Sequence, residues 1–200
     1  LMCYGVESAS ELEELLRPAN ALSVGPGLGQ SEWAIALFQK AIETNLPMVV
    51  DADALNLLSK NPQHHDNWVL TPHPGEAARL LGCSSEDIQA DRFAAVYELQ
   101  RRYGGVVVLK GSGTLISNGE APTRLSTWGN PGMGSGGMGD VLAGVIGGLL
   151  AQHFPIMDAA CVGVTLHGMA ADKAAELDGE RGTLAMDLMP HLRRLANLIY

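Results

Sequence analysis

The sequence has little positive charge. Its 200 residues include 13 Lys and Arg against 22 Asp and Glu, which gives a formal net charge of −9 at pH 7. Sequence-independent binding to nucleic acid, or to an acidic membrane, depends on clustered basic side chains. The composition therefore argues against both partners. Any bound phosphate must be held locally, by backbone amides and helix N-termini.

Cysteine and long apolar runs are also scarce. The three cysteines, Cys3, Cys83 and Cys161, are an odd number and lack the paired spacing of a metal site. They favour a reducing, cytoplasmic setting. The longest apolar stretch, residues 141–150, contains three glycines and is too short to cross a bilayer. No secretory signal is recognised.

Short apolar runs alternate with stretches of helical periodicity. Strands are predicted over residues 21–24, 47–50, 68–70 and 106–109, and helices over residues 32–42, 76–81, 84–103, 139–152, 157–176 and 184–198. Residues 114–116 and 123–126, separated by Asn118-Gly119, predict an antiparallel hairpin with a tight turn. Strands that are apolar throughout indicate a mostly parallel sheet covered on both faces. We expect one three-layer α/β/α domain with an antiparallel edge.

The strongest chemical signal is the segment from Asn130 to Asp140, in which five glycines precede an apolar helix. Successive amides in such a loop can hold phosphate oxygens, and the predicted anion hole is Gly136, Gly137, Met138 and Gly139. Asp140 would repel that phosphate unless it served as a base for a hydroxyl or bound a metal. The alternative is a carboxylate that interacts with the helix dipole. No Lys-Ser or Lys-Thr follows the glycines, which excludes a Walker A loop.

Further polar clusters follow other predicted strands, where open parallel sheets bind their ligands. Gly25 to Gly29 and Lys110 to Thr114 are each compatible with a ligand loop or with a plain turn. His73 and Glu76 lie in a proline-stiffened segment that opens a helix.

Two aspartates end another predicted strand. Asp51 and Asp53 suit a water-mediated metal site or helix capping, and we favour capping for at least one of them.

Taken in order, the motifs at residues 25–29, 50–56, 70–76, 109–114 and 129–140 resemble those of the ADP-dependent NAD(P)H-hydrate dehydratase family. The resemblance spans nearly the whole chain. It implies a ribokinase-like fold, and dehydration of the S epimer of NADH-hydrate or NADPH-hydrate. ADP is the implied co-substrate, released as AMP and phosphate, and Mg²⁺ is the implied cofactor.

The resemblance also implies roles for individual residues. Gly27, His73 and Asp140 contact the hydrated dinucleotide, and Asp140 matches the aspartate that takes a proton from the attacking hydroxyl in related kinases. Glu76 matches a carboxylate that orients Mg²⁺ through water. The residues that contact the adenine nucleotide are Lys110, Gly111, Ser112, Gly113, Thr114 and Gly139.

Family members usually begin this domain with a strand and a helix that do not precede Leu1, so we expect both to be missing. We expect a homo-oligomer, and a fusion to an N-terminal epimerase domain is compatible with the resemblance. Two alternatives stay open. One is a small-molecule kinase of the same fold, acting on a sugar or a vitamin alcohol; the other is a non-catalytic nucleotide-binding module.

Overall fold

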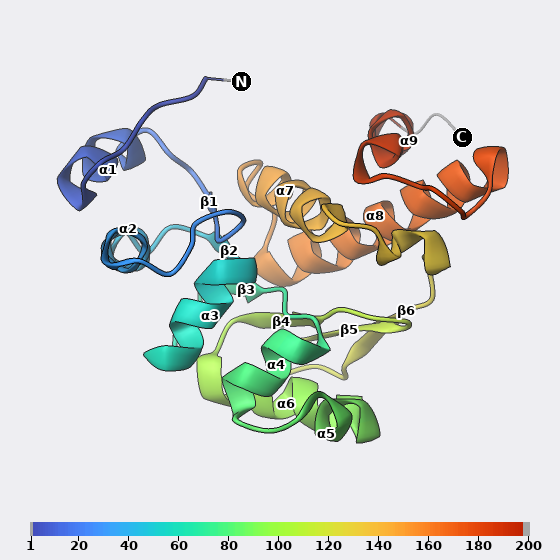
Figure 1. The fold of residues 1–200 in the computed structure, drawn as a ribbon, viewed down its shortest axis with the longest axis horizontal. Helices are drawn as coiled ribbons and strands as arrows, with labels where there is room; N and C mark the ends of the chain where they lie inside the picture. The colour runs from blue at the N-terminus through green and yellow to red at the C-terminus, as the bar shows by residue number, and fades with distance from the viewer. Residues whose placement is uncertain (1, 198–200) are drawn as a thin grey trace.

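A six-stranded sheet forms the centre of the molecule (Figure 1). The computed structural model describes residues 2–197. The strands lie side by side in chain order: β1 (Leu22–Val24), β2 (Met48–Val50), β3 (Trp68–Leu70), β4 (Val106–Leu109), β5 (Thr114–Ser117) and β6 (Arg124–Ser126). Neighbours from β1 to β4 pair in parallel, whereas β5 and β6 are antiparallel. The predicted parallel sheet with an antiparallel edge is confirmed.

Helices cover both faces of the sheet because successive strand residues point to opposite sides. In β2, Met48 and Val50 belong to one buried cluster, and Val49 between them belongs to another. Figure 1 shows α3, α4 and α6 on one side of the sheet, and α7 and α8 on the other. The helices of the first layer are α2 (Glu32–Glu43), α3 (Ala52–Lys60), α4 (Pro74–Leu81) and α6 (Arg92–Tyr103); those of the second are α7 (Met138–Leu150) and α8 (Ile156–Asp178).

The remaining helices are short and peripheral. Helix α1 (Ala9–Leu16) contacts α2, and α9 (Leu188–Ala196) contacts α8. Short turns of 3-10 helix, η1 (Pro131–Gly134) and η2 (Ala185–Asp187), precede α7 and α9. No helix within residues 2–197 is both long and apolar enough to cross a membrane.

Local signals set most helix boundaries. Ser31 accepts a hydrogen bond from the Ala34 amide and caps α2. Gly82 ends α4 in the left-handed conformation, and Gly104 ends α6 with a φ of 75°.

Two helix predictions need correction. The single helix expected over residues 84–103 is two helices, α5 (Ser85–Ala90) and α6, because Asp91 leaves helical geometry and caps α6 through the Ala94 amide. The helix expected over residues 184–198 begins with η2 and becomes α-helical only at Leu188. Leu198 lies outside the described residues.

The hairpin is joined by a loop of residues 118–123 and not by the tight turn expected at Asn118-Gly119. The Asn118 side chain accepts hydrogen bonds from the amides of Glu120 and Ala121, and so organises the longer loop.

Candidate active site

Polar side chains from three neighbouring strands meet at the carboxyl edge of the sheet. Asp51 follows β2, Thr71 follows β3 and Lys110 follows β4. One oxygen of Asp51, Oδ1, accepts from Thr71 Oγ1 at 2.8 Å and from Lys110 Nζ at 2.9 Å. Lys110 Nζ also lies 3.8 Å from Glu76 Oε2. Asp51 and Glu76 are buried, so the ammonium group balances two carboxylates that have little contact with water.

The capping role favoured for Asp51 or Asp53 is wrong. Asp51 occupies the N-cap position of α3, but its side chain makes no cap bond and turns to Lys110 instead. Asp53 accepts from the Gly29 amide at 2.9 Å and from Asn56 Nδ2 at 3.4 Å. Asp51 is thus a site residue that sequence reasoning undervalued. The usable signal was its position, since Asp51 and Lys110 each follow a buried strand of one parallel sheet.

The start of α7 lies directly against this charged cluster. A Cβ atom added to Gly139 would lie 3.2 Å from Lys110 Nζ and 3.6 Å from Asp51 Oδ2. Gly137 caps the helix with a φ of 87° and no side-chain bond. Within the described residues, the amides of Gly136, Gly137, Gly139 and Asp140 have no hydrogen-bond acceptor. These free donors at a helix N-terminus are suited to bind an anion.

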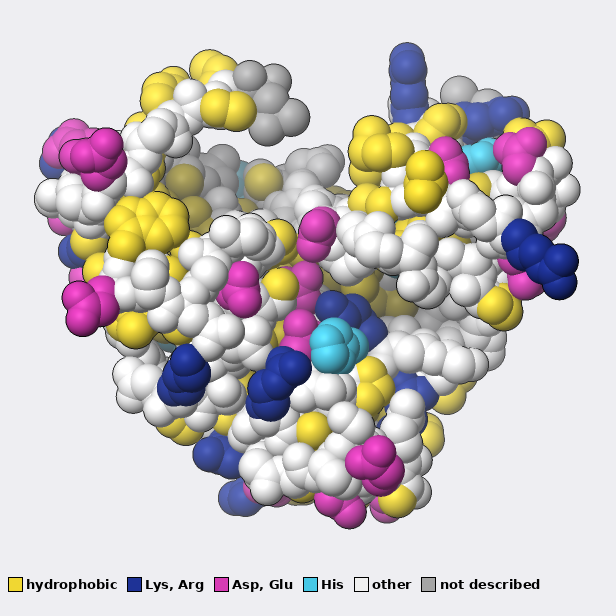
Figure 2. All heavy atoms as spheres, in the orientation of Figure 1, with side chains coloured by type: hydrophobic (Ala, Val, Ile, Leu, Met, Phe, Trp, Pro, Cys, Tyr) yellow, Lys and Arg dark blue, Asp and Glu magenta, His cyan; other side chains and the backbone are white. Residues whose placement is uncertain are grey.

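Asp140 is exposed in the first turn of α7 and makes no hydrogen bond or ion pair within residues 2–197. Nearby, Ser135 Oγ is buried and has no partner in the same part of the chain. Figure 2 shows acidic, basic and histidine side chains together near the centre of one face, where the surface is hollowed between the N-terminal and C-terminal helices.

His73 is fixed by the helix that it caps. Its Nδ1 accepts from the amides of Gly75 at 2.9 Å and Glu76 at 3.3 Å, and Glu76 Oε2 accepts from the His73 amide at 2.7 Å. Because Nδ1 is an acceptor, the ring proton of the neutral imidazole is on Nε2. The side chain is half exposed, so this N–H is available to a ligand.

The loop after β1 reaches the same edge of the sheet. Gly25 has a φ of 133°, and a Cβ there would lie 1.7 Å from the Asp51 carbonyl oxygen, so only glycine lets the ends of β1 and β2 approach this closely. Gly27, with a φ of 69°, is exposed and nothing lies within 4 Å of its Cβ position. The loop therefore packs tightly against the chain at Gly25 and leaves space for a ligand at Gly27.

A buried histidine supports the start of α7 from behind. His167 of α8 received no role from the sequence, yet its imidazole hydrogen-bonds with the Met138 backbone. Burial lowers the pKa of His167 to about 4, with a smaller contribution in the same direction from the nearby Lys110 charge, while the bond to Met138 acts in the opposite direction. Its Nε2 is buried and has no partner within residues 2–197. A neutral imidazole is thus part of the packing behind the start of α7.

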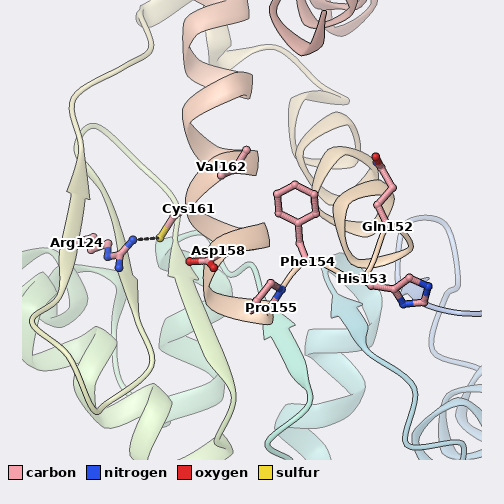
Figure 3. A pocket seen from close by; sticks show the side chains of 8 residues that line it. All are labelled: Arg124, Gln152, His153, Phe154, Pro155, Asp158, Cys161 and Val162. Atoms are coloured by element: carbon pink, nitrogen blue, oxygen red, sulfur yellow. Dashed lines mark hydrogen bonds between the residues drawn. The ribbon is translucent and has the colours of Figure 1, made fainter.

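A separate pocket lies at the far end of α7 and contains none of the predicted site residues (Figure 3). Arg124 hydrogen-bonds to Cys161 Sγ at 3.4 Å there, beside Asp158 and Phe154. Burial raises the pKa of the Cys161 thiol, so the cysteine is not activated as a nucleophile.

Comparison with known proteins identifies the family. The model of the NAD(P)H-hydrate dehydratase family matches residues 1–194. A bifunctional NAD(P)H-hydrate repair enzyme of Coxiella burnetii is 55% identical over 197 residues, which cover 98% of this chain and 40% of that protein. An ADP-dependent (S)-NAD(P)H-hydrate dehydratase of Neisseria meningitidis serogroup B is 44% identical over 189 residues, covering 90% and 64%. The chain thus spans less than two thirds of the length of either relative.

A solved structure agrees with these matches. An ADP/ATP-dependent NAD(P)H-hydrate dehydratase from Bacillus subtilis, co-crystallised with ATP and Mg²⁺, superposes with a TM-score of 0.83 at 31% identity, covering 92% of this chain and 67% of that one. The fold is ribokinase-like, as the sequence motifs implied. The chain belongs to the NAD(P)H-hydrate dehydratase family.

Proposed function

We propose that the chain dehydrates the S epimer of NADH-hydrate or NADPH-hydrate, using ADP and releasing AMP and phosphate. The observation that carries the proposal is the start of α7, where free amides stand directly beside the exposed Asp140 carboxylate and the paired Lys110 ammonium. Free amides and an ammonium suit the oxygens of a phosphate, and a carboxylate beside them suits a hydroxyl that must lose its proton. The names of the relatives point to the same reaction.

In this proposal the hydrated dinucleotide and the adenine nucleotide bind to different parts of the carboxyl edge of the sheet. Gly27, His73 and Asp140 contact the hydrated dinucleotide, with the His73 Nε2–H as donor. The adenine nucleotide contacts Gly139 and loop 110–114, that is, Lys110, Gly111, Ser112, Gly113 and Thr114. The open surface at Gly27 and the half-exposed His73 ring support this division.

The chemistry follows from the position of Asp140. Its carboxylate accepts the hydroxyl proton of the hydrate while the hydroxyl oxygen forms a bond to the terminal phosphorus of ADP, and the bond from that phosphorus to the AMP oxygen breaks. The free amides at the start of α7 hold the phosphate oxygens as their charge shifts. The ring then loses phosphate by C–O cleavage and a proton from the adjacent carbon, which restores the dihydronicotinamide.

Glu76 fits a supporting contact to Mg²⁺. Within residues 2–197, no cluster of three or more His, Cys, Asp and Glu is suited to hold a metal alone. Glu76 Oε2 is engaged by the His73 amide, but Oε1 has only a 3.6 Å contact with His73 Nε2 and is free to accept from a metal-bound water. The Lys110 charge 3.8 Å away disfavours direct coordination. When bound, Mg²⁺ would neutralise charge on the nucleotide phosphates.

We further propose a cytoplasmic homo-oligomer. A fusion to an epimerase domain is proposed for the full-length protein, since the Coxiella relative is named bifunctional and this chain covers 40% of it.

The test is recovery of dihydronicotinamide absorbance from hydrated NADH and NADPH with ADP. We expect recovery of the S epimer only, dependent on ADP and accompanied by one AMP per turnover. The R epimer is the matched control. Sugars and vitamin alcohols with ATP form the competing arm, and their phosphorylation in the absence of hydrate recovery would refute the dehydratase assignment. Binding of ADP with neither reaction would leave a nucleotide-binding module.

A further inference from the structure

Arg92, at the start of α6, grips the main chain of loop 110–114. Its Nη2 donates to the carbonyl oxygens of Leu109 at 3.1 Å and Lys110 at 3.3 Å, and its Nη1 donates to the carbonyl oxygen of Ser112. The remaining carbonyl in this stretch, that of Gly111, accepts from Thr114 Oγ1 at 3.1 Å. Four consecutive carbonyls therefore have donors from side chains of the chain itself.

The middle amides of the same loop, in contrast to its carbonyls, lack hydrogen-bond partners in the part of the chain that the structure describes. Within the described residues, those of Gly111, Ser112 and Gly113 have no acceptor. In a trans peptide the carbonyl of one residue and the amide of the next point in opposite directions, and the described chain contains no cis peptide. A carbonyl that turns toward Arg92 therefore turns the following amide away from it.

The peptide between Leu109 and Lys110 illustrates this rule. Its carbonyl binds Arg92, and its amide donates on the other side to the Pro72 carbonyl at 2.9 Å. The same geometry applied to the next carbonyls that Arg92 binds aims the Gly111 and Gly113 amides away from the guanidinium. Two amides of one short loop that point to the same side can together bind an anionic oxygen.

The glycine at position 111 makes the grip possible. A Cβ there would lie 3.0 Å from Arg92 Nη2, and its φ of 144° is one that other residues rarely adopt. Arg92 itself is half-buried, and its Nε is buried and unpartnered within residues 2–197. The guanidinium group has two terminal nitrogens in one rigid plane, and each binds at least one carbonyl of the loop. The single ammonium group of lysine cannot reproduce this arrangement.

We propose that Arg92 is a positioning residue for the nucleotide: by binding the carbonyls of Lys110 and Ser112, it aims the amides of Gly111 and Gly113 at anionic oxygens of the nucleotide. Arg92 acts through the loop and does not touch the ligand. This inference rests on the proposed function insofar as loop 110–114 is the nucleotide side of the site.

The experiment compares Arg92→Met, which keeps an unbranched stem but removes every donor, with Arg92→Lys and with Arg101→Met. Arg101 lies on the same helix and pairs with the exposed Glu98, so it is the matched control. Initial rates on hydrated NADH give kcat and separate KM values for ADP and for the hydrate. Titration calorimetry with ADP alone gives the nucleotide Kd without turnover, and denaturation gives the folded fraction.

For Arg92→Met we expect the KM and Kd for ADP to rise at least about tenfold, with the hydrate KM unchanged. Arg92→Lys should recover part of this loss, and Arg101→Met should behave as the wild type. A purely architectural role would lower the active fraction, and hence kcat, while leaving both KM values unchanged; that result overturns the proposal.

The two proposals fail in different ways. If the wild type binds ADP but does not recover the hydrate, the dehydratase assignment fails, and the ADP Kd of the Arg92 variants still decides the role of Arg92. If the wild type does not bind ADP at all, the positioning role is refuted together with the proposed function.

Discussion

The two glycine-rich loops of the candidate site are anchored by side chains of opposite charge. Loop 110–114 is held through its carbonyls by the cation of Arg92. Loop 129–140 is held through its first donors by the anion of Asp172, which accepts from the Gly129 amide and from Asn130 Nδ2, both at 2.9 Å. Asn130 Oδ1 in turn accepts from the Gly132 amide at 3.0 Å. The anchor decides which backbone groups remain available to a ligand.

This difference gives each loop its own distribution of free donors. Because the Arg92 cation donates hydrogen bonds to carbonyls, the middle amides of loop 110–114 remain free. An anion accepts hydrogen bonds from amides, so Asp172 fixes loop 129–140 at its beginning, and a run of free amides lies near its end, at the start of α7. Both arrangements favour an anion between the loops without basic surface patches, in agreement with the acidic composition.

The largest expected effect is on the chemistry at the end of the second loop. Asp140→Asn keeps the shape of the side chain but removes the proton acceptor. We expect turnover to fall at least about a hundredfold, the lower range for loss of a positioned base. The ADP Kd and the free energy of unfolding should stay near the wild-type values, because Asp140 has no partner within the described residues. Near-normal turnover would remove Asp140 from the mechanism.

The next effect concerns the packing behind the same loop. Burial holds the pKa of His167 at about 4 in the folded protein, whereas an unfolded chain takes up the proton near pH 6.5. Between these values the unfolded state binds more protons, so stability falls as the pH decreases from 6.5 to 4, by about 3 kcal/mol.

His167→Gln removes this titration. Denaturant unfolding of both proteins at pH 4.5 and 7 isolates it, because the carboxylates contribute to each protein alike. The stability difference between wild type and variant should shift in favour of the variant at the lower pH. A difference that does not change with pH would show that His167 takes up its proton in the folded protein as easily as in the unfolded chain.

The anchor of the second loop can be tested directly. Asp172→Ala leaves the Gly129 amide and Asn130 Nδ2 without their acceptor, and we expect a loss of about 1–3 kcal/mol in the free energy of unfolding. If Asp172 and Arg92 act on separate loops, the folded fraction of Asp172→Ala should have a lower kcat. Its KM for ADP should not show the selective rise expected for Arg92→Met. The same selective rise in both variants would remove the distinction between the loops. Asp172→Asn keeps one acceptor and should fall between the alanine variant and the wild type.

Much of the fold could be predicted from the sequence, because apolar runs of three or four residues between glycine and proline signals are sufficient to define buried parallel strands. The break at Asp91 was missed since helical periodicity continues across it. The role of Asp51 was misjudged for a different reason. A local cap and a partner 59 residues away compete for one carboxylate, and only the fold brings Lys110 within reach.

The free amides are a further feature that spacing does not reveal. Glycine content indicates that a loop accepts unusual backbone angles, but it does not say which way each peptide faces. That orientation depends on Arg92 and Asp172, which lie on helices distant in sequence from the loops they hold.

The smallest expected effect comes from comparing one glycine in each loop. Gly113 has a φ of 68°, and a Cβ there would make an ordinary 3.6 Å contact with Leu125, so Gly113→Val costs mainly backbone strain, about 1–2 kcal/mol. Gly136 lacks a positive φ, and nothing lies within 4 Å of its Cβ position, so Gly136→Ala should change stability by less than about 0.5 kcal/mol.

For both variants, we expect the folded fraction to lose more free energy of ADP binding than the protein loses free energy of unfolding. The reason is that each added side chain lies beside amides that the ligand needs. Denaturation curves paired with ADP titration corrected for the folded fraction measure the two effects separately. Reduced stability with unaltered affinity in Gly113→Val would make loop 110–114 a plain turn and withdraw it from the site. Unaltered affinity in Gly136→Ala would restrict the anion hole to the amides of α7 itself, and the two loops would then differ in whether they bind the ligand, and not only in how they are anchored.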